Sequence, residues 1–148
     1  MLEMKKMVVS ACLGFENCRY DGKMSRTRIA ARSGQKIIFL PVCPEASIGL
    51  GVPRKKLRLV NSAGGARLIQ PHTGADLTGK MRNFTRRFIR SAGKIDGFIL
   101  KKRSPSCGMG DVKMYSSAAS RKPLASRGTG LFAAESIRLC PKASFYGC

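Results

Sequence analysis

The apolar positions along the chain fall into short runs that predict strands alternating with helices. Strands are predicted over residues 6–11, 36–40 and 95–100, with a last short strand over 144–146. Weaker strand patterns at 57–60 and 66–69 flank the glycine-rich residues 63–65, and this arrangement predicts a hairpin. The alternation favours an α/β class: one layered, Rossmann-like domain with a mostly parallel sheet flanked by helices.

The clearest helix follows residue 76. Four apolar residues recur there at spacings of four, three and four: Leu77, Met81, Phe84 and Phe88. This spacing places them on one face of a helix, and basic residues occupy the other faces. Gly93 is expected to end this helix. Further helices are predicted over 25–32, where the sequence is basic, and over 130–139.

Three cysteines follow predicted strands directly or within a few residues: Cys12, Cys43 and Cys107. Because parallel strands present their carboxyl ends at one edge of a sheet, we expect these thiols to meet there. Pro41 and Pro44 are expected to end strand pairing and to hold Cys43 in a rigid loop. The alternative is that small buried thiols happen to lie near strand ends.

Composition limits the class of protein. With 148 residues, of which 43% are hydrophobic, the chain is expected to form a single domain over residues 1–148. It has no run of about 18 apolar residues and no secretory pattern, so we expect a cytoplasmic protein. The cytosol keeps thiols reduced, so six cysteines indicate metal binding or catalysis rather than disulfides.

The charge balance is strongly basic, with 28 Lys and Arg against 8 Asp and Glu and a net charge of +20. Such a surface attracts polyanions, most often nucleic acid, although it can also be merely solvated. Five cations are expected near the edge that holds the thiols: Arg19, Arg54, Lys101, Lys102 and Arg103. They would attract an anionic substrate such as a nucleotide or tRNA phosphate, and Tyr20 could stack on a base.

The motifs around the three cysteines resemble those of the thiouracil desulfidase family. They are Ser10–Gly14 with Arg19–Gly22, Pro41–Glu45 with Gly49–Arg54, and Ser104–Met109. Segments at 67–68, 73–78 and 128–133 also match in order, so the resemblance covers essentially the whole chain.

The resemblance implies a 4Fe-4S cluster held by Cys12, Cys43 and Cys107, with one iron that has no protein ligand. An iron with an open position is a Lewis acid that can take the soft sulfur of a thiocarbonyl. A closed zinc site remains an alternative, with His72 or Cys18 as the fourth ligand. Otherwise Cys18, like Cys140, is expected to be an ordinary thiol.

Glu45 is one of few acids in a basic chain. From the residues alone it is either a general acid/base beside the thiols or a surface carboxylate paired with Arg54. The resemblance favours catalysis by Glu45. It also implies a catalytic serine, and Ser104, three residues before Cys107, matches that position.

Three further residues are expected to contact the substrate: Arg19, Tyr20 and Ser106. We expect Ser106 to orient the loop that carries Cys107. No hydrolase partner accompanies either serine, because the sequence has one histidine and no G-x-S-x-G motif.

The function that the resemblance implies is non-redox desulfuration of 2- or 4-thiouracil by hydrolase- or lyase-type C–S cleavage. Water attacks the thiocarbonyl carbon, Glu45 moves the protons, and sulfide is released. A free base is favoured over tRNA, because relatives that desulfurate thiouridine in tRNA carry a second domain. The alternatives are a tRNA thiouridine desulfidase, a basic tRNA-binding module, a structural metal protein and an iron–sulfur electron carrier.

Overall fold

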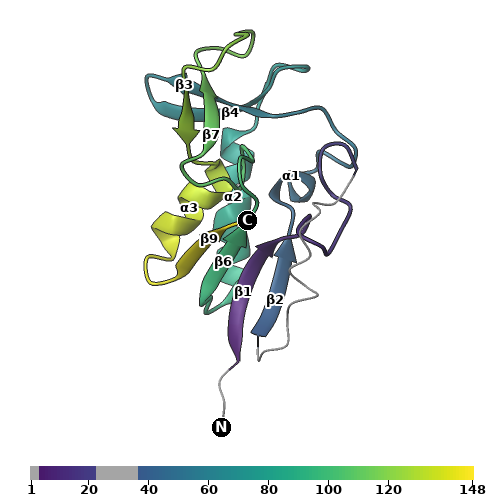
Figure 1. Cartoon of the computed structure of the whole chain (residues 1–148), viewed down its shortest axis with the longest axis vertical. Helices are drawn as coiled ribbons and strands as arrows, with labels where there is room; N and C mark the ends of the chain where they lie inside the picture. Colours follow the sequence, from purple (N-terminus) through teal and green to yellow (C-terminus); the bar gives the residue numbers. More distant parts are fainter. Residues whose placement is uncertain (1–3, 23–36) are drawn as a thin grey trace.

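In the computed structural model, which describes residues 4–22 and 37–148, two β-sheets and three helices are formed. Figure 1 shows the first sheet below, with α2 and α3 packed beside it, and strands of the second sheet beyond the tips of its arrows. The helix predicted over 25–32 lies outside the described residues.

The first sheet consists of β1 (Lys5–Ser10), β2 (Ile37–Val42), β6 (Gly97–Leu100) and β9 (Ser144–Gly147) in the order β2-β1-β6-β9. All neighbouring strands are parallel. The predicted α/β class with a parallel sheet is therefore confirmed. Because β1 pairs with both β2 and β6, the segments after these three strands leave the sheet at one edge.

The two prolines near Cys43 do not act as expected. Pairing of β2 with β1 continues through Pro41, opposite Val9, to Val42. This is tolerated because β2 is an edge strand, where a missing N–H need not interrupt the sheet. Pro44 begins α1 (Pro44–Ser47) instead of a rigid loop, since proline is well accommodated in a first helical turn.

The second sheet has the strand order β5-β4-β3-β7-β8. Its strands are β3 (Arg58–Ser62), β4 (Gly65–Gln70), β5 (Ala75–Asp76), β7 (Val112–Tyr115) and β8 (Ala125–Gly128). The antiparallel β3–β4 pair confirms the predicted hairpin. The sequence did not indicate β5, which has two residues, or β7 and β8, which have four residues each; β8 is mostly exposed and has no apolar run.

The long helices α2 (Thr78–Ala92) and α3 (Leu131–Leu139) confirm the predictions for these segments. Gly93 follows α2 with a φ of 71°, a conformation that glycine adopts without steric cost. Phe132 of α3 packs against Phe88 of α2 and Phe98 of β6, with ring centroids 5.9 and 6.5 Å away. No helix in the described part of the chain is both long enough and apolar enough to cross a membrane.

Candidate active site

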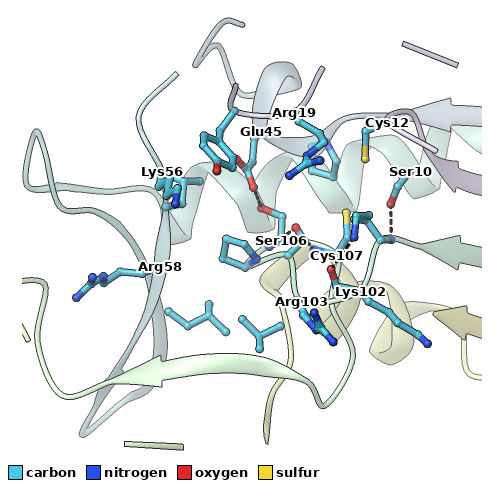
Figure 2. Close-up of a pocket in the computed structure, with 18 of the residues that line it drawn as sticks. Ser10, Cys12, Arg19, Glu45, Lys56, Arg58, Lys102, Arg103, Ser106 and Cys107 are labelled. Atoms are coloured by element: carbon cyan, nitrogen blue, oxygen red, sulfur yellow. Dashed lines mark hydrogen bonds between the residues drawn. The ribbon is translucent and has the colours of Figure 1, made fainter. Parts of the chain in front are cut away.

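A cavity of about 740 Å³ lies between the carboxyl edge of the first sheet and the second sheet. Its volume lies in the range of small-molecule sites. The structure places every site residue proposed from the sequence along this cavity: Cys12, Arg19, Tyr20, Cys43, Glu45, Ser104, Ser106 and Cys107. Figure 2 shows Glu45 and Ser106 near the middle, with Cys12 and Cys107 on one side and Lys56 and Arg58 on the other.

The cysteines reach the cavity from three strand ends. Cys12 follows β1, Cys43 follows β2, and Cys107 lies in the loop after β6, 95 residues from Cys12. Cys18 also lines the cavity, and its backbone carbonyl accepts a hydrogen bond from the Cys43 thiol (3.5 Å). From the sequence, Cys18 was either a fourth zinc ligand or an ordinary thiol, and its position beside Cys12 and Cys43 depends on the path of the loop after β1. Cys140 does not line the cavity.

These contacts change the acidity of the thiols. The hydrogen bond from Cys18 lowers the pKa of Cys43 to about 6, with help from the Ala46 backbone N–H and the Arg54 charge. The same thiol lowers the pKa of Cys12, while these two contacts raise the pKa of Cys18 itself. Burial raises the pKa of Cys107. The site therefore favours the thiolate form at Cys43 and shifts the pKa of Cys12 in the same direction.

Glu45, on α1, is buried with 8% of its surface exposed. Its Oε1 accepts a hydrogen bond from Arg54 Nε and its Oε2 accepts one from Ser106 Oγ, both at 2.9 Å. Glu45 is therefore paired with Arg54, as expected if it were a surface carboxylate. It is nevertheless buried and lines the cavity. Because a carboxylate has about four lone-pair sites, it can still accept a proton or a further hydrogen bond.

The two serines of the cysteine loop have different hydrogen-bond partners. Ser104 Oγ accepts hydrogen bonds from the backbone N–H groups of Ser106 (3.1 Å) and Cys107 (3.0 Å), so Ser104 fixes the local loop geometry. Ser106 is buried and donates to Glu45. The hydroxyl that orients this loop therefore belongs to Ser104, whereas we expected Ser106.

Helix α3 supports the cysteine loop through backbone contacts at its first turn. Gly130 N–H donates to the Gly108 carbonyl (2.8 Å) and Ala133 N–H donates to the Ser106 carbonyl (3.0 Å). A Cβ at position 130 would lie 2.3 Å from the Ser106 carbonyl carbon, so only glycine permits this approach. The loop that carries Cys107 is thus held against the end of a core helix.

The second sheet supplies a half of the cavity that the sequence did not predict. Lys56 Nζ lies 4.9 Å from the centre of the Tyr20 ring, and the Arg58 guanidinium lies 3.7 Å from that of Tyr115. The lining includes two acids, Glu45 and Asp111, and eight cations: Arg19, Arg54, Lys56, Arg58, Lys101, Lys102, Arg103 and Lys113. The cavity is therefore strongly electropositive.

The donor set fits an iron–sulfur cluster. Thiolates are the usual ligands of such clusters, and the surrounding cations offset their negative charge. Among the described residues, no group of three or more Cys, His, Asp or Glu is arranged to hold a single metal ion. A cluster does not require that arrangement, because each cysteine binds a different iron. His72, one suggested fourth zinc ligand, is exposed and does not line the cavity.

Thiols and one buried carboxylate lie at the carboxyl edge of the parallel sheet, the place where open α/β sheets bind their ligands. The family model for 2-thiouracil desulfurase matches residues 7–144, so the chain belongs to that family.

Two relatives extend this comparison. The uncharacterized protein YbbK of Bacillus subtilis (strain 168) is 29% identical over 135 residues, which cover 86% of this chain and 87% of the relative. The solved structure of the 4Fe-4S-dependent thiouracil desulfidase TudS is similar with a TM-score of 0.69 and 24% identity. That alignment covers 97% of this chain and 90% of TudS, and it shows a shared fold.

Proposed function

We propose that this protein is a desulfidase, acting as one domain, that converts a thiolated nucleobase such as 2- or 4-thiouracil to its oxo form and releases sulfide. The reaction takes one water per thiocarbonyl, gives a carbonyl and hydrogen sulfide, and involves no net electron transfer. The observation that carries the proposal is the convergence of three strand-end cysteines and a buried carboxylate on one cavity. Family membership supports the same activity.

Cys12, Cys43 and Cys107 would hold a 4Fe-4S cluster. The similar TudS is described as 4Fe-4S-dependent. When bound, such a cluster supplies an iron Lewis acid for the soft sulfur of a thiocarbonyl. The lowered pKa values of Cys12 and Cys43 favour loss of their protons, and metal ligation needs deprotonated sulfurs. The high pKa of buried Cys107 is offset on ligation, since a coordinated thiol loses its proton.

Glu45 is the proposed general acid/base. Its carboxylate removes a proton from the water that adds to the thiocarbonyl carbon, then returns a proton to the departing sulfur. Ser106 and Arg54 each hold one carboxylate oxygen, which fixes the direction in which the remaining lone pairs point. Ser104, which matches the family's catalytic serine, is proposed to assist Glu45, and its Oγ also accepts hydrogen bonds from the backbone N–H groups of Ser106 and Cys107.

The excess of cations around the cavity favours a second candidate substrate, a thiolated nucleotide or tRNA. Lys56 lies over the Tyr20 ring, Arg58 stacks on Tyr115, and Arg19 lines the same cavity, so cations and aromatic rings suited to a nucleotide occur together there. A free base needs no such charge. Comparing kcat/KM for free 4-thiouracil with that for thiolated tRNA decides between the two substrates.

The proposal is tested by anaerobic reconstitution with iron and sulfide, followed by measurement of sulfide and uracil released from thiouracil. We expect equal amounts of both products, without added reductant or oxidant. A protein that assembles the cluster but releases no sulfide from free base, nucleotide or tRNA would overturn the desulfidase proposal. It would leave a structural or electron-transfer role for the metal.

A further inference from the structure

Arg54 is the side chain that links most parts of the site. Its side chain is 4% exposed. Nε donates to Glu45 Oε1 (2.9 Å), one terminal nitrogen donates to the Gly51 carbonyl (3.0 Å), and the other donates to the Cys18 carbonyl (2.9 Å) and contacts Cys43 Sγ (3.7 Å). No other side-chain group of the described residues is shown bonded to both Glu45 and a cavity cysteine.

The partners of Arg54 come from separate segments. Cys43 and Glu45 flank the start of α1, while Cys18 belongs to the loop after β1. The Arg54 backbone N–H also donates to the Tyr20 carbonyl in that same loop (2.8 Å). One residue therefore fixes the loop after β1 against the α1 segment, on the side of the cavity where the cysteines meet.

Charge explains why a guanidinium is suited to this place. Glu45 and a metal-bound Cys43 are two anions that lie two residues apart in a partly desolvated site, so they repel each other unless a cation lies between them. Arginine offers five N–H donors in a planar fork, whereas a lysine ammonium is a point charge on a flexible stem. Lysine would supply the charge, but it could not bond the carboxylate, the sulfur and the Cys18 carbonyl in the observed directions.

We propose that Arg54 is a positioning residue that acts on both halves of the site: it holds Glu45 in the orientation that proton transfer needs, and it stabilises the Cys43 sulfur as a cluster ligand. The inference rests on the proposed function for its catalytic half. It predicts that cluster retention and turnover weaken together when the guanidinium is removed, although Arg54 itself neither ligates metal nor transfers a proton.

The test compares Arg54→Met and Arg54→Lys with wild type after anaerobic reconstitution. The first readout is the rate at which visible cluster absorbance is lost to an excess of EDTA, which needs no substrate. Residues that support metal ligands typically change affinity or activity by about 10- to 100-fold, so we expect loss that much faster in Arg54→Met. Arg54→Lys, which keeps the charge, should lie between Arg54→Met and wild type.

The second readout is steady-state sulfide release, expressed per assembled cluster. We expect kcat to fall by about 10-fold or more in Arg54→Met, as for a lost supporting hydrogen bond, with KM changed by less than about threefold. Arg67→Met is the matched control, because Arg67 forms an exposed ion pair with Asp76 on the second sheet, outside the cavity. It should match wild type in both readouts.

Apo-protein stability supplies a readout independent of the cluster. A double-mutant cycle between Arg54→Met and Glu45→Gln should show coupling of about 10-fold in the unfolding equilibrium constant, as expected for a buried charged pair. Absence of coupling, or cluster loss and kcat both within twofold of Arg67→Met, would overturn the positioning role. If wild type binds a cluster without releasing sulfide, the proposed function fails, while cluster loss and coupling still test Arg54.

Discussion

At the residue scale, the buried carboxylate of Glu45 allows proton transfer to be separated from cluster assembly. Glu45→Gln keeps the size of the side chain and can still bond Arg54 or Ser106, but an amide cannot exchange a proton near neutral pH. We expect the cluster to assemble normally while turnover falls by about 10² to 10⁴-fold, the usual contribution of a general acid/base. The measurement is sulfide release per assembled cluster.

Glu135→Gln is a suitable control for this experiment. Glu135 is also buried, and it accepts hydrogen bonds from Arg86 and Arg138, but it does not line the cavity. The substitution should lower stability and leave turnover per cluster unchanged. Unchanged turnover in Glu45→Gln would instead leave Glu45 as an ion-pair partner of Arg54.

The three strand-end cysteines give a second residue-scale prediction. Replacing Cys12, Cys43 or Cys107 by Ala should abolish both visible absorbance and sulfide release, because a cluster with three protein ligands has no spare anchor. Cys140→Ala should retain both, since Cys140 does not line the cavity. The iron content per chain and the visible spectrum check the prediction, and full absorbance in Cys107→Ala would refute the ligand assignment.

The sequence predicts the site residues that follow strands, but not those whose positions depend on a loop or on the packing of the two sheets. Cys12 and Cys43 follow strands of a parallel sheet, so strand order alone brings them to one edge. The position of Cys18 depends on the path of the loop after β1, and a loop has no periodicity from which that path could be predicted. Lys56 and Arg58 reach the cavity because the second sheet faces the first, and no local pattern specifies that packing.

At the scale of elements, the contact between α3 and the cysteine loop predicts the effect of one added methyl group. In Gly130→Ala the Cβ would lie 2.3 Å from the Ser106 carbonyl carbon, so the loop or the helix must shift. We expect a loss of about 1–3 kcal/mol in the free energy of unfolding, as for overpacked sites, together with reduced iron retention. Denaturant unfolding and iron content per chain measure the two effects.

Gly79→Ala is the matched substitution in a helix with open space. Position 79 lies in the first turn of α2, and nothing lies within 4 Å of a Cβ there. Alanine is favoured over glycine in helices by up to about 1 kcal/mol, so this variant should be as stable as wild type or more stable, with unchanged iron content. Equal behaviour of the two variants would mean that the α3 contact does not hold the cysteine loop.

Elements with a sustained pattern were predicted well, and so were the short strands β6 and β9, whereas β5, β7 and β8 of the second sheet were not. The apolar stripe of α2 defines a helix by itself, and the β3–β4 hairpin is indicated by a turn between two apolar runs. In contrast, β8 has exposed residues through most of its length and pairs with β7 through an irregular register. Its formation depends on tertiary pairing, which no local propensity encodes.

At the scale of the whole molecule, the net charge of +20 predicts a dependence of stability on salt. Self-repulsion destabilises the compact state, and the Debye length shortens from about 10 Å at 0.1 M salt to about 3 Å at 1 M. We expect Tm to rise as potassium chloride increases over this range. A matched series with sucrose controls for effects unrelated to charge, and a Tm that stays constant or falls with salt would contradict the prediction.

The position of β1 between β2 and β6 has a consequence for the stage at which a cluster can be installed. A nascent chain that has emerged only as far as residue 96 has Cys12 and Cys43 but lacks β6 and the loop with the third proposed ligand, Cys107. Under the proposed function, the cluster is therefore installed after synthesis of the site is complete, into a folded apo-protein. Any protein that delivered the cluster would meet an electropositive cavity lining, so an acidic docking face on it would speed the transfer.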